Sequence, residues 1–142
     1  MNFGAYSGYV QVLARVCLSA IFIIGGLSFI QAETFSGISG MIGGLGFPMP
    51  ALVAVLVILI KVGGGLSVLT GFKAKWGALA LALFTFLTVV FVHSPSTWGD
   101  QVQFLMAMKN IAIIGGLLLI AGNGAGAMSL KCTCGKSCPM CD

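Results

Sequence analysis

Residues 51–71 read ALVAVLVILIKVGGGLSVLTG, and this run is the clearest indication of the fold class. A helix needs about 20 mostly apolar residues to cross the roughly 30 Å of hydrocarbon in a bilayer. The apolar run is continuous rather than alternating, and it is too long for a strand, so it favours a spanning helix over a barrel strand. Lys61 near its middle is its single charged residue. Residues 51–71 are therefore predicted to cross a membrane as a helix.

Three further segments have the same character, at residues 12–30, 76–92 and 104–121. A glycine-rich stretch with two prolines, residues 36–50, is expected to break the chain between the first two spans, because glycine and proline are the strongest local breakers. Residues 93–100, HSPSTWGD, separate the last two spans. The predicted class is an all-α, integral membrane four-helix bundle.

The composition agrees with a protein whose main solvent is lipid. Apolar residues make up 58% of the 142 residues and charged residues only 7%, against about a quarter charged in a typical soluble domain. So few charges exclude a soluble enzyme, a disordered chain and a secreted disulfide scaffold. No basic stripe is present that would hold nucleic acid. The expected partner is the bilayer itself.

The flanking charges predict the orientation. One side of the membrane receives both termini and the loop between the second and third spans, and it carries most of the basic residues: Arg15, Lys73, Lys75, Lys131 and Lys136. The other side carries Glu33, His93 and Asp100. The excess of Lys and Arg on cytoplasmic loops therefore predicts that both termini are cytoplasmic.

The order of several short motifs resembles the DoxX family of small four-helix membrane proteins. The motifs are LAR at residues 13–15, IFIIGG at 21–26, GFPMP at 46–50, GGL at 64–66, LTG at 69–71, His93, KNIAIIGGL at 109–117 and GAMSL at 126–130. The resemblance covers about residues 10–130. It departs at two positions, since family members often carry Lys where this chain has Phe29 and Glu where it has Lys61.

The resemblance has functional implications. Some family members are subunits of a thiosulfate–quinone oxidoreductase, and others are linked to redox or sulfur stress. It therefore implies a protein of the bacterial inner membrane with a quinone ligand and a redox partner subunit. No nucleotide loop, haem-attachment motif or catalytic triad is visible, so the chain is not expected to be an enzyme on its own.

A polar set at membrane depth is the first candidate site. Lys61 lies about ten residues, or roughly 15 Å, from either end of its helix, so we favour an inward-facing ammonium over one that snorkels to the interface. Glu33, His93, Lys109 and Asn110 are predicted to gather with it toward the outer leaflet. Such a cluster suits a small anion, a quinone head group or a metal; the alternative is a satisfied polar plug that fixes helix register.

The second candidate site is the C-terminal tail, residues 131–142, which follows a transmembrane domain at residues 1–130. It reads KCTCGKSCPMCD and contains Cys132, Cys134, Cys138 and Cys141. Thiolates so close together suit a soft metal ion such as Cu(I) or Zn(II). Dithiol redox chemistry and a lipidated or inert tail are the alternatives. Cys17, in the first span, is expected to be a small buried apolar residue.

Three functions follow from these features. The first is soft-metal handling or a role in redox or sulfur stress, with a cytoplasmic metal-binding tail. The second is the membrane subunit of a quinone-linked oxidoreductase of the thiosulfate–quinone type. The third is a scaffold or assembly module, and glycine-rich helix faces such as residues 63–65 also suit a homo-oligomer.

Overall fold

A computed structural model describes residues 4–124 of the chain. Within that range every regular element is helical. The order is α1 (Gly4–Leu27), η1 (Ser28–Ile30), α2 (Ala32–Gly44), α3 (Pro50–Thr70), α4 (Ala74–Phe91), η2 (Pro95–Thr97) and α5 (Gln101–Asn123). Four stretches are long and apolar enough to span a bilayer, namely Gly8–Ile30, Pro50–Thr70, Ala74–Phe91 and Gln101–Asn123. The predicted all-α membrane bundle is confirmed.

The glycine-rich stretch after the first span differs from the prediction. We expected residues 36–50 to be an irregular break, but most of it forms helix α2. Ile42 is buried there and α2 packs against α3, so tertiary packing overrides the low helix propensity of glycine. The break is confined to residues 45–49, where Gly46 has φ +82° and Met49 has φ +55°. Pro50 then begins α3, a position where its missing N–H has no cost.

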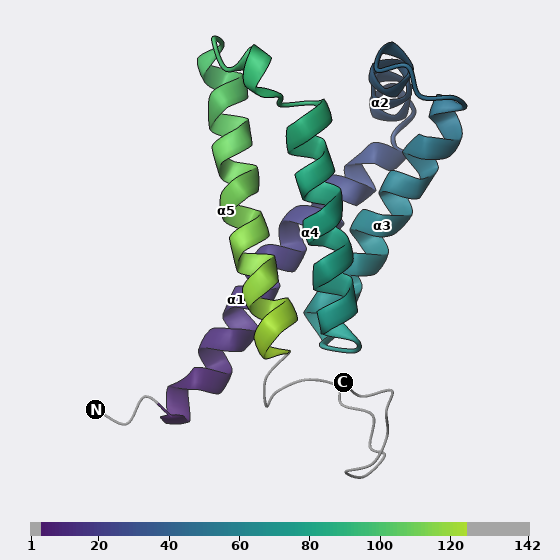
Figure 1. The fold of residues 1–142 in the computed structure, drawn as a ribbon. Coiled ribbons are helices and arrows are strands. Elements are labelled where there is room, and N and C mark those ends of the chain that lie inside the picture. The colour runs from purple at the N-terminus through teal and green to yellow at the C-terminus, as the bar shows by residue number, and fades with distance from the viewer. Residues whose placement is uncertain (1–3, 125–142) are drawn as a thin grey trace.

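The long helices α1, α3, α4 and α5 run alternately in opposite directions between the two ends of the bundle (Figure 1). The start of α1, the α3–α4 turn and the end of α5 lie at one end of the bundle, which we name the termini end. Helix α2 and η2 lie at the opposite end, the α2 end. Helix α1 crosses the bundle obliquely and packs along α3, while α4 lies between α3 and α5. The assignment of the termini end to the cytoplasm remains a prediction.

Small residues let the helices approach closely in the core. A Cβ at Gly64 would lie 2.7 Å from Leu81 Cγ, and one at Gly65 would lie 2.7 Å from Ile23 Cγ1. Both distances are shorter than any normal carbon contact, so only glycine allows α3 to meet α4 and α1 at this separation. Leu81 and Val68 are fully buried at these crossings. The glycine-rich face of α3 is thus used inside the bundle.

Arg15 has a structural role that the sequence does not reveal. Its side chain is only 4% exposed. Nε donates to the backbone oxygen of Val68 at 2.8 Å, and Nη2 donates to that of Leu69 at 2.5 Å. These carbonyls lie in the last turn of α3, where no intrahelical donor follows them and where the helix dipole favours a cation. Arg15 therefore joins the middle of α1 to the C-terminal end of α3.

The expectation for Cys17 is wrong, because its side chain is exposed. Arg15 and Ser19, two residues before and after it, are buried. Two helical positions rotate a side chain by about 200°, so Cys17 lies on the opposite face of α1. That face is shared by large apolar residues such as Ile24, which is 68% exposed. Their exposure at membrane depth is exposure to hydrocarbon.

Candidate functional site

A cavity of about 470 Å³ lies toward the α2 end of the bundle. All five α-helices contribute to its lining, most of which is apolar. The apolar lining residues are Ile21, Phe22, Phe29, Ile38, Met41, Ile42, Leu45, Val57, Phe84, Val92 and Ile113. The polar lining residues are Lys61, Thr85, Thr88, His93, Lys109 and Asn110. The volume and mixed lining are typical of a small-molecule pocket.

The cavity brings together most of the polar residues singled out from the sequence. Lys61, His93, Lys109 and Asn110 all line it, although they come from three different stretches of the chain. Glu33 does not line it, and its side chain is exposed in the first turn of α2. A carboxylate is favoured there by the positive end of the helix dipole. The structure therefore separates Glu33 from the residues with which it was predicted to gather.

Lys61 faces the cavity, as expected from its depth. Its Nζ lies 4.0 Å from the centroid of the Phe29 ring, within cation–π distance. Gly25 lies one helical turn before Phe29, and a Cβ at this position would be 3.0 Å from Lys61 Nζ. Ile21, one turn earlier, also lines the cavity. One face of the first span thus accommodates the ammonium with a glycine and holds it with an aromatic ring.

The contacts of His93 orient its ring. Nδ1 lies 2.6 Å from Gln103 Oε1, and the backbone oxygen of His93 accepts from Trp98 Nε1 at 3.1 Å. In the neutral tautomer whose Nδ1 donates to the Gln103 carbonyl oxygen, Nε2 is a hydrogen-bond acceptor. The Trp98 ring in turn packs edge-on against Phe104, with ring centroids 5.7 Å apart. The loop before α5 therefore holds His93 at the α2 end of the cavity.

Further functional side chains escaped the reading of the sequence. Thr85 and Thr88 of α4 line the cavity, and each hydroxyl donates to the carbonyl four residues earlier, at 2.7 Å and 3.0 Å. Their oxygens keep lone pairs that can accept a hydrogen bond. Their spacing of three residues in an apolar span was the available signal. Phe29 stood out only as a departure from the family pattern. Gln103 offered no signal, because its role depends on its contact with His93 across the loop between α4 and α5.

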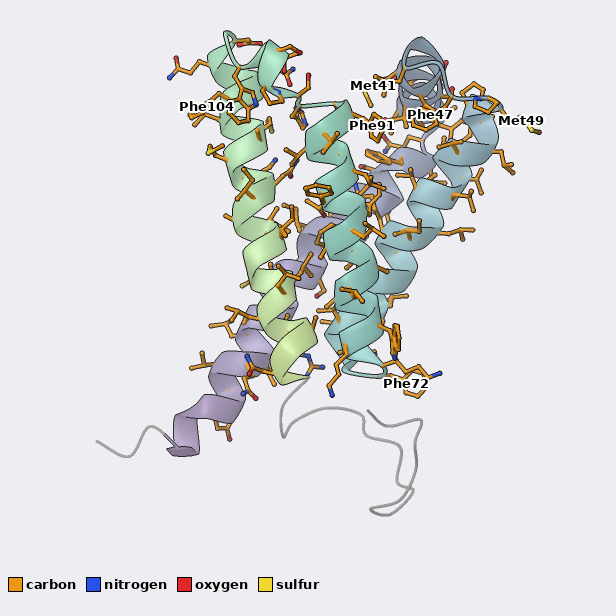
Figure 2. The ribbon with its side chains drawn as sticks, in the orientation of Figure 1. Met41, Phe47, Met49, Phe72, Phe91 and Phe104 are labelled. Atoms are coloured by element: carbon orange, nitrogen blue, oxygen red, sulfur yellow. The ribbon has the colours of Figure 1, made fainter. Side chains whose placement is uncertain are left out.

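The loop between α2 and α3 contacts the end of α4. Figure 2 shows Phe47 and Phe91 near one another, with centroids 5.7 Å apart and an edge-to-face angle of 77°. Met41 projects from α2 nearby, whereas Met49 points away from the bundle and is 69% exposed. The Phe47–Phe91 pair ties the α2–α3 loop to α4, and so it helps to position α2 beside the cavity.

The charges of the cavity are all of one sign. The ammonium groups of Lys61 and Lys109 repel each other, and none of the described lining residues is Asp or Glu. Lys109 Nζ donates to Met106 Sδ at 3.1 Å. Residues 4–124 also contain no group of three His, Cys, Asp or Glu side chains suited to a metal ion. The donors therefore suit a ligand with negative or electron-rich oxygen rather than a cation.

The comparisons with known proteins agree with the fold. The DoxX family model matches residues 10–94. The chain is 38% identical over 119 residues to the inner membrane protein YqjF of Escherichia coli (strain K12), an alignment that covers 84% of this chain and 87% of that protein. It is 33% identical over 132 residues to the inner membrane protein YphA of the same organism, covering 91% and 93%. No solved structure matches.

The two departures from the family pattern prove to be neighbours. Phe29 and Lys61, which stand where family members often carry Lys and Glu, are in direct contact in the cavity wall.

Four apolar spans and inner membrane relatives support a multi-pass location in the bacterial inner membrane. The chain belongs to the DoxX family.

Proposed function

We propose that this DoxX protein is the ligand-binding membrane subunit of a quinone-linked redox system, and that its cavity holds a quinone head group. The observation that carries the proposal is a mostly apolar cavity of about 470 Å³ whose charged residues, Lys61 and Lys109, are hydrogen-bond donors. A quinone is a flat apolar ring with two carbonyl oxygens that only accept. Lys61 and Asn110 can donate to such oxygens, and the aromatic and aliphatic wall suits the ring.

The remaining side chains define what the chain contributes to the reaction. A bound quinone supplies electron and proton transfer within the lipid phase. His93, oriented by Gln103 through Nδ1, presents Nε2 as a proton acceptor at the α2 end. A partner subunit would then carry out the oxidation or reduction of a second substrate.

A binding titration tests the proposal. The purified protein in lipid nanodiscs is titrated with decylubiquinone, and binding is followed by quenching of tryptophan fluorescence. Lys61→Met removes a donor at the cavity wall, and the dissociation constant is expected to rise about tenfold, the loss of roughly 1.4 kcal/mol. Lys75→Met, an exposed site at the termini end, is the matched control. No saturable binding to the wild type, or equal affinity in Lys61→Met, would overturn the proposal.

The cysteine tail supports a second function, soft-metal handling. Cys132, Cys134, Cys138 and Cys141 lie outside the described residues, so their spacing in the sequence is what supports this proposal. The described chain ends at Gly124, where a Cβ would lie 3.5 Å from Lys75 Cε. The last described residue therefore lies at the end of the bundle that carries the basic loop. A cytoplasmic location there would keep the thiols reduced and able to bind Cu(I) or Zn(II).

Elemental analysis together with thiol titration separates the readings of the tail. Metal that co-purifies with the wild type and is lost when all four tail cysteines are replaced by serine supports metal handling. Free thiols that form a reversible disulfide without metal favour dithiol redox chemistry.

A scaffold role remains the third proposal, and it would be favoured by a membrane partner that co-purifies equally with wild type and with Lys61→Met.

A further inference from the structure

The contact between α1 and α5 closes one part of the bundle and leaves another open. A Cβ at Gly116 of α5 would lie 3.2 Å from Leu18 Cδ1 of α1, so the two helices touch at this level. The helices run in opposite directions (Figure 1). One turn nearer the α2 end, the corresponding residues are Ile21 and Ile113. Both of these line the cavity, so the cavity begins one helical turn from the Leu18–Gly116 contact, on the side of the α2 end.

Beyond that contact the two helices part. Helix α5 stays packed along α4, whereas α1 continues beside α3 and has only a short contact with α5. Figure 1 shows α1 moving away from α5 as it approaches the α2 end. The cavity is lined from both sides of this gap. We name the gap between Ile21 and Ile113, which ends at the Leu18–Gly116 contact, the α1–α5 seam.

The seam opens at membrane depth. Ile21 lines the cavity and is nevertheless 42% exposed, while its neighbour Phe22 is 5% exposed. Ile21 lies six residues beyond Arg15, or about 9 Å further along α1, and Arg15 is level with the last turn of α3. The exposed side of Ile21 therefore meets the hydrocarbon of the bilayer rather than water.

We propose that the α1–α5 seam is a lateral opening through which the cavity takes its ligand from the membrane, and that this ligand is an amphiphile with an apolar chain. The chain lies in the seam against Ile21 and Ile113, and the oxygen-bearing head group lies beside Lys61 and Lys109. Charge complementarity favours a head group with negative or electron-rich oxygens. This inference rests on the proposed function for the head group, and it excludes a purely water-soluble anion as the ligand.

The opening itself is tested without any ligand. Ile113→Trp is made in a Trp76→Phe/Trp98→Phe background and reconstituted in vesicles of phosphatidylcholine with brominated or plain acyl chains. Brominated chains quench an indole that they touch. Leu119→Trp in the same background is the matched control, because Leu119 is 66% exposed on the outer surface of α5. We expect quenching in both variants; an indole that is quenched in Leu119→Trp but not in Ile113→Trp would overturn the lateral opening.

The position of the ligand's apolar chain is tested with a matched pair of ligands. Decylubiquinone and the same ring without the chain are compared, with affinities corrected for partition into lipid. Burial of about two methylene groups is worth roughly tenfold in affinity, so the wild type is expected to prefer the chain-bearing ligand by at least that much. Ile113→Trp narrows the seam and is expected to lower the affinity for the chain-bearing ligand by more than it lowers the affinity for the ring alone.

The outcomes separate this inference from the proposed function. Equal affinity for both ligands in the wild type, or an equal loss of affinity for both in Ile113→Trp, overturns the placement of the ligand's apolar chain in the seam. Quinone binding itself then still stands. Binding of neither ligand overturns the proposed function and the chain placement together, and the bromine quenching then still decides whether the seam is open. If Ile113→Trp does not fold, Ile21→Phe on the facing helix repeats the comparison of the two ligands.

Discussion

The substitution Arg15→Met gives the sharpest test of how the bundle is held together. Arg15 is buried and donates to the Val68 and Leu69 carbonyls at 2.8 Å and 2.5 Å. Methionine fills a similar volume but offers no donor. Both carbonyls belong to the last turn of α3, so they lose their partner in a part of the bundle where water is scarce. The expected result is a weakened joint between α1 and α3.

The magnitude follows from the hydrogen bonds. A hydrogen bond to a charged group contributes about 1.5–3 kcal/mol, and an unsatisfied buried carbonyl costs about 1–3 kcal/mol. The gain from no longer burying a guanidinium offsets part of this loss. We therefore expect Arg15→Met to lower the free energy of unfolding by about 3 kcal/mol. At about 2–4 °C per kcal/mol, the midpoint of thermal unfolding in detergent falls by roughly 6–12 °C.

The assay is thermal unfolding in one mild detergent, followed by loss of the monodisperse peak in size-exclusion chromatography. Arg15→Lys keeps the charge but not the fork of donors, and we expect an intermediate midpoint. Lys75→Met removes an exposed charge at the same end of the bundle and is expected to unfold within about 1–2 °C of the wild type. An unchanged midpoint in Arg15→Met would refute the reasoning that these hydrogen bonds join α1 to α3.

Two further predictions concern close packing and helix capping. Gly64→Ala places a carbon 2.7 Å from Leu81 Cγ and is expected to cost about 1–3 kcal/mol by overpacking; Gly63→Ala, where a Cβ meets nothing within 4 Å, is expected to be neutral or to stabilise by up to about 1 kcal/mol. Thermal unfolding of both variants measures this, and equal midpoints would contradict a close α3–α4 crossing. Asp100→Ala removes the carboxylate that accepts from the Val102 amide at 3.0 Å and is expected to cost about 1 kcal/mol. Faster amide exchange confined to the first turn of α5 would confirm the cap, and unchanged exchange would contradict it.

Part of the candidate site could be predicted from the cost of placing polar groups in lipid. Lys61, His93, Lys109 and Asn110 stand out in apolar segments because each needs a compensating environment there, and the structure places all four around one cavity. Glu33 has the same kind of position in the sequence, yet it lies in α2, is exposed and does not line the cavity. Depth along a segment identifies such residues, but helix rotation decides which of them meet.

The class of protein and the number and approximate place of its spans follow from the order of its amino acids. Hydrocarbon thickness and the need to satisfy every backbone group leave a helix of about 20 apolar residues as the simple solution, and this constraint acts on each segment separately. Residues 51–71 were therefore sufficient to predict a helix that the structure places at Pro50–Thr70.

Which faces of these helices meet depends on their packing in three dimensions. The contact of Lys61 with Phe29, the hydrogen bonds of Arg15 to the end of α3 and the exposure of Cys17 all join or separate residues from different segments. In lipid every apolar face is equally acceptable to the solvent, so hydropathy does not distinguish an inward face from an outward one. Close packing at small residues and the pairing of buried donors make that choice, and they place the cavity and its seam between α1 and α5.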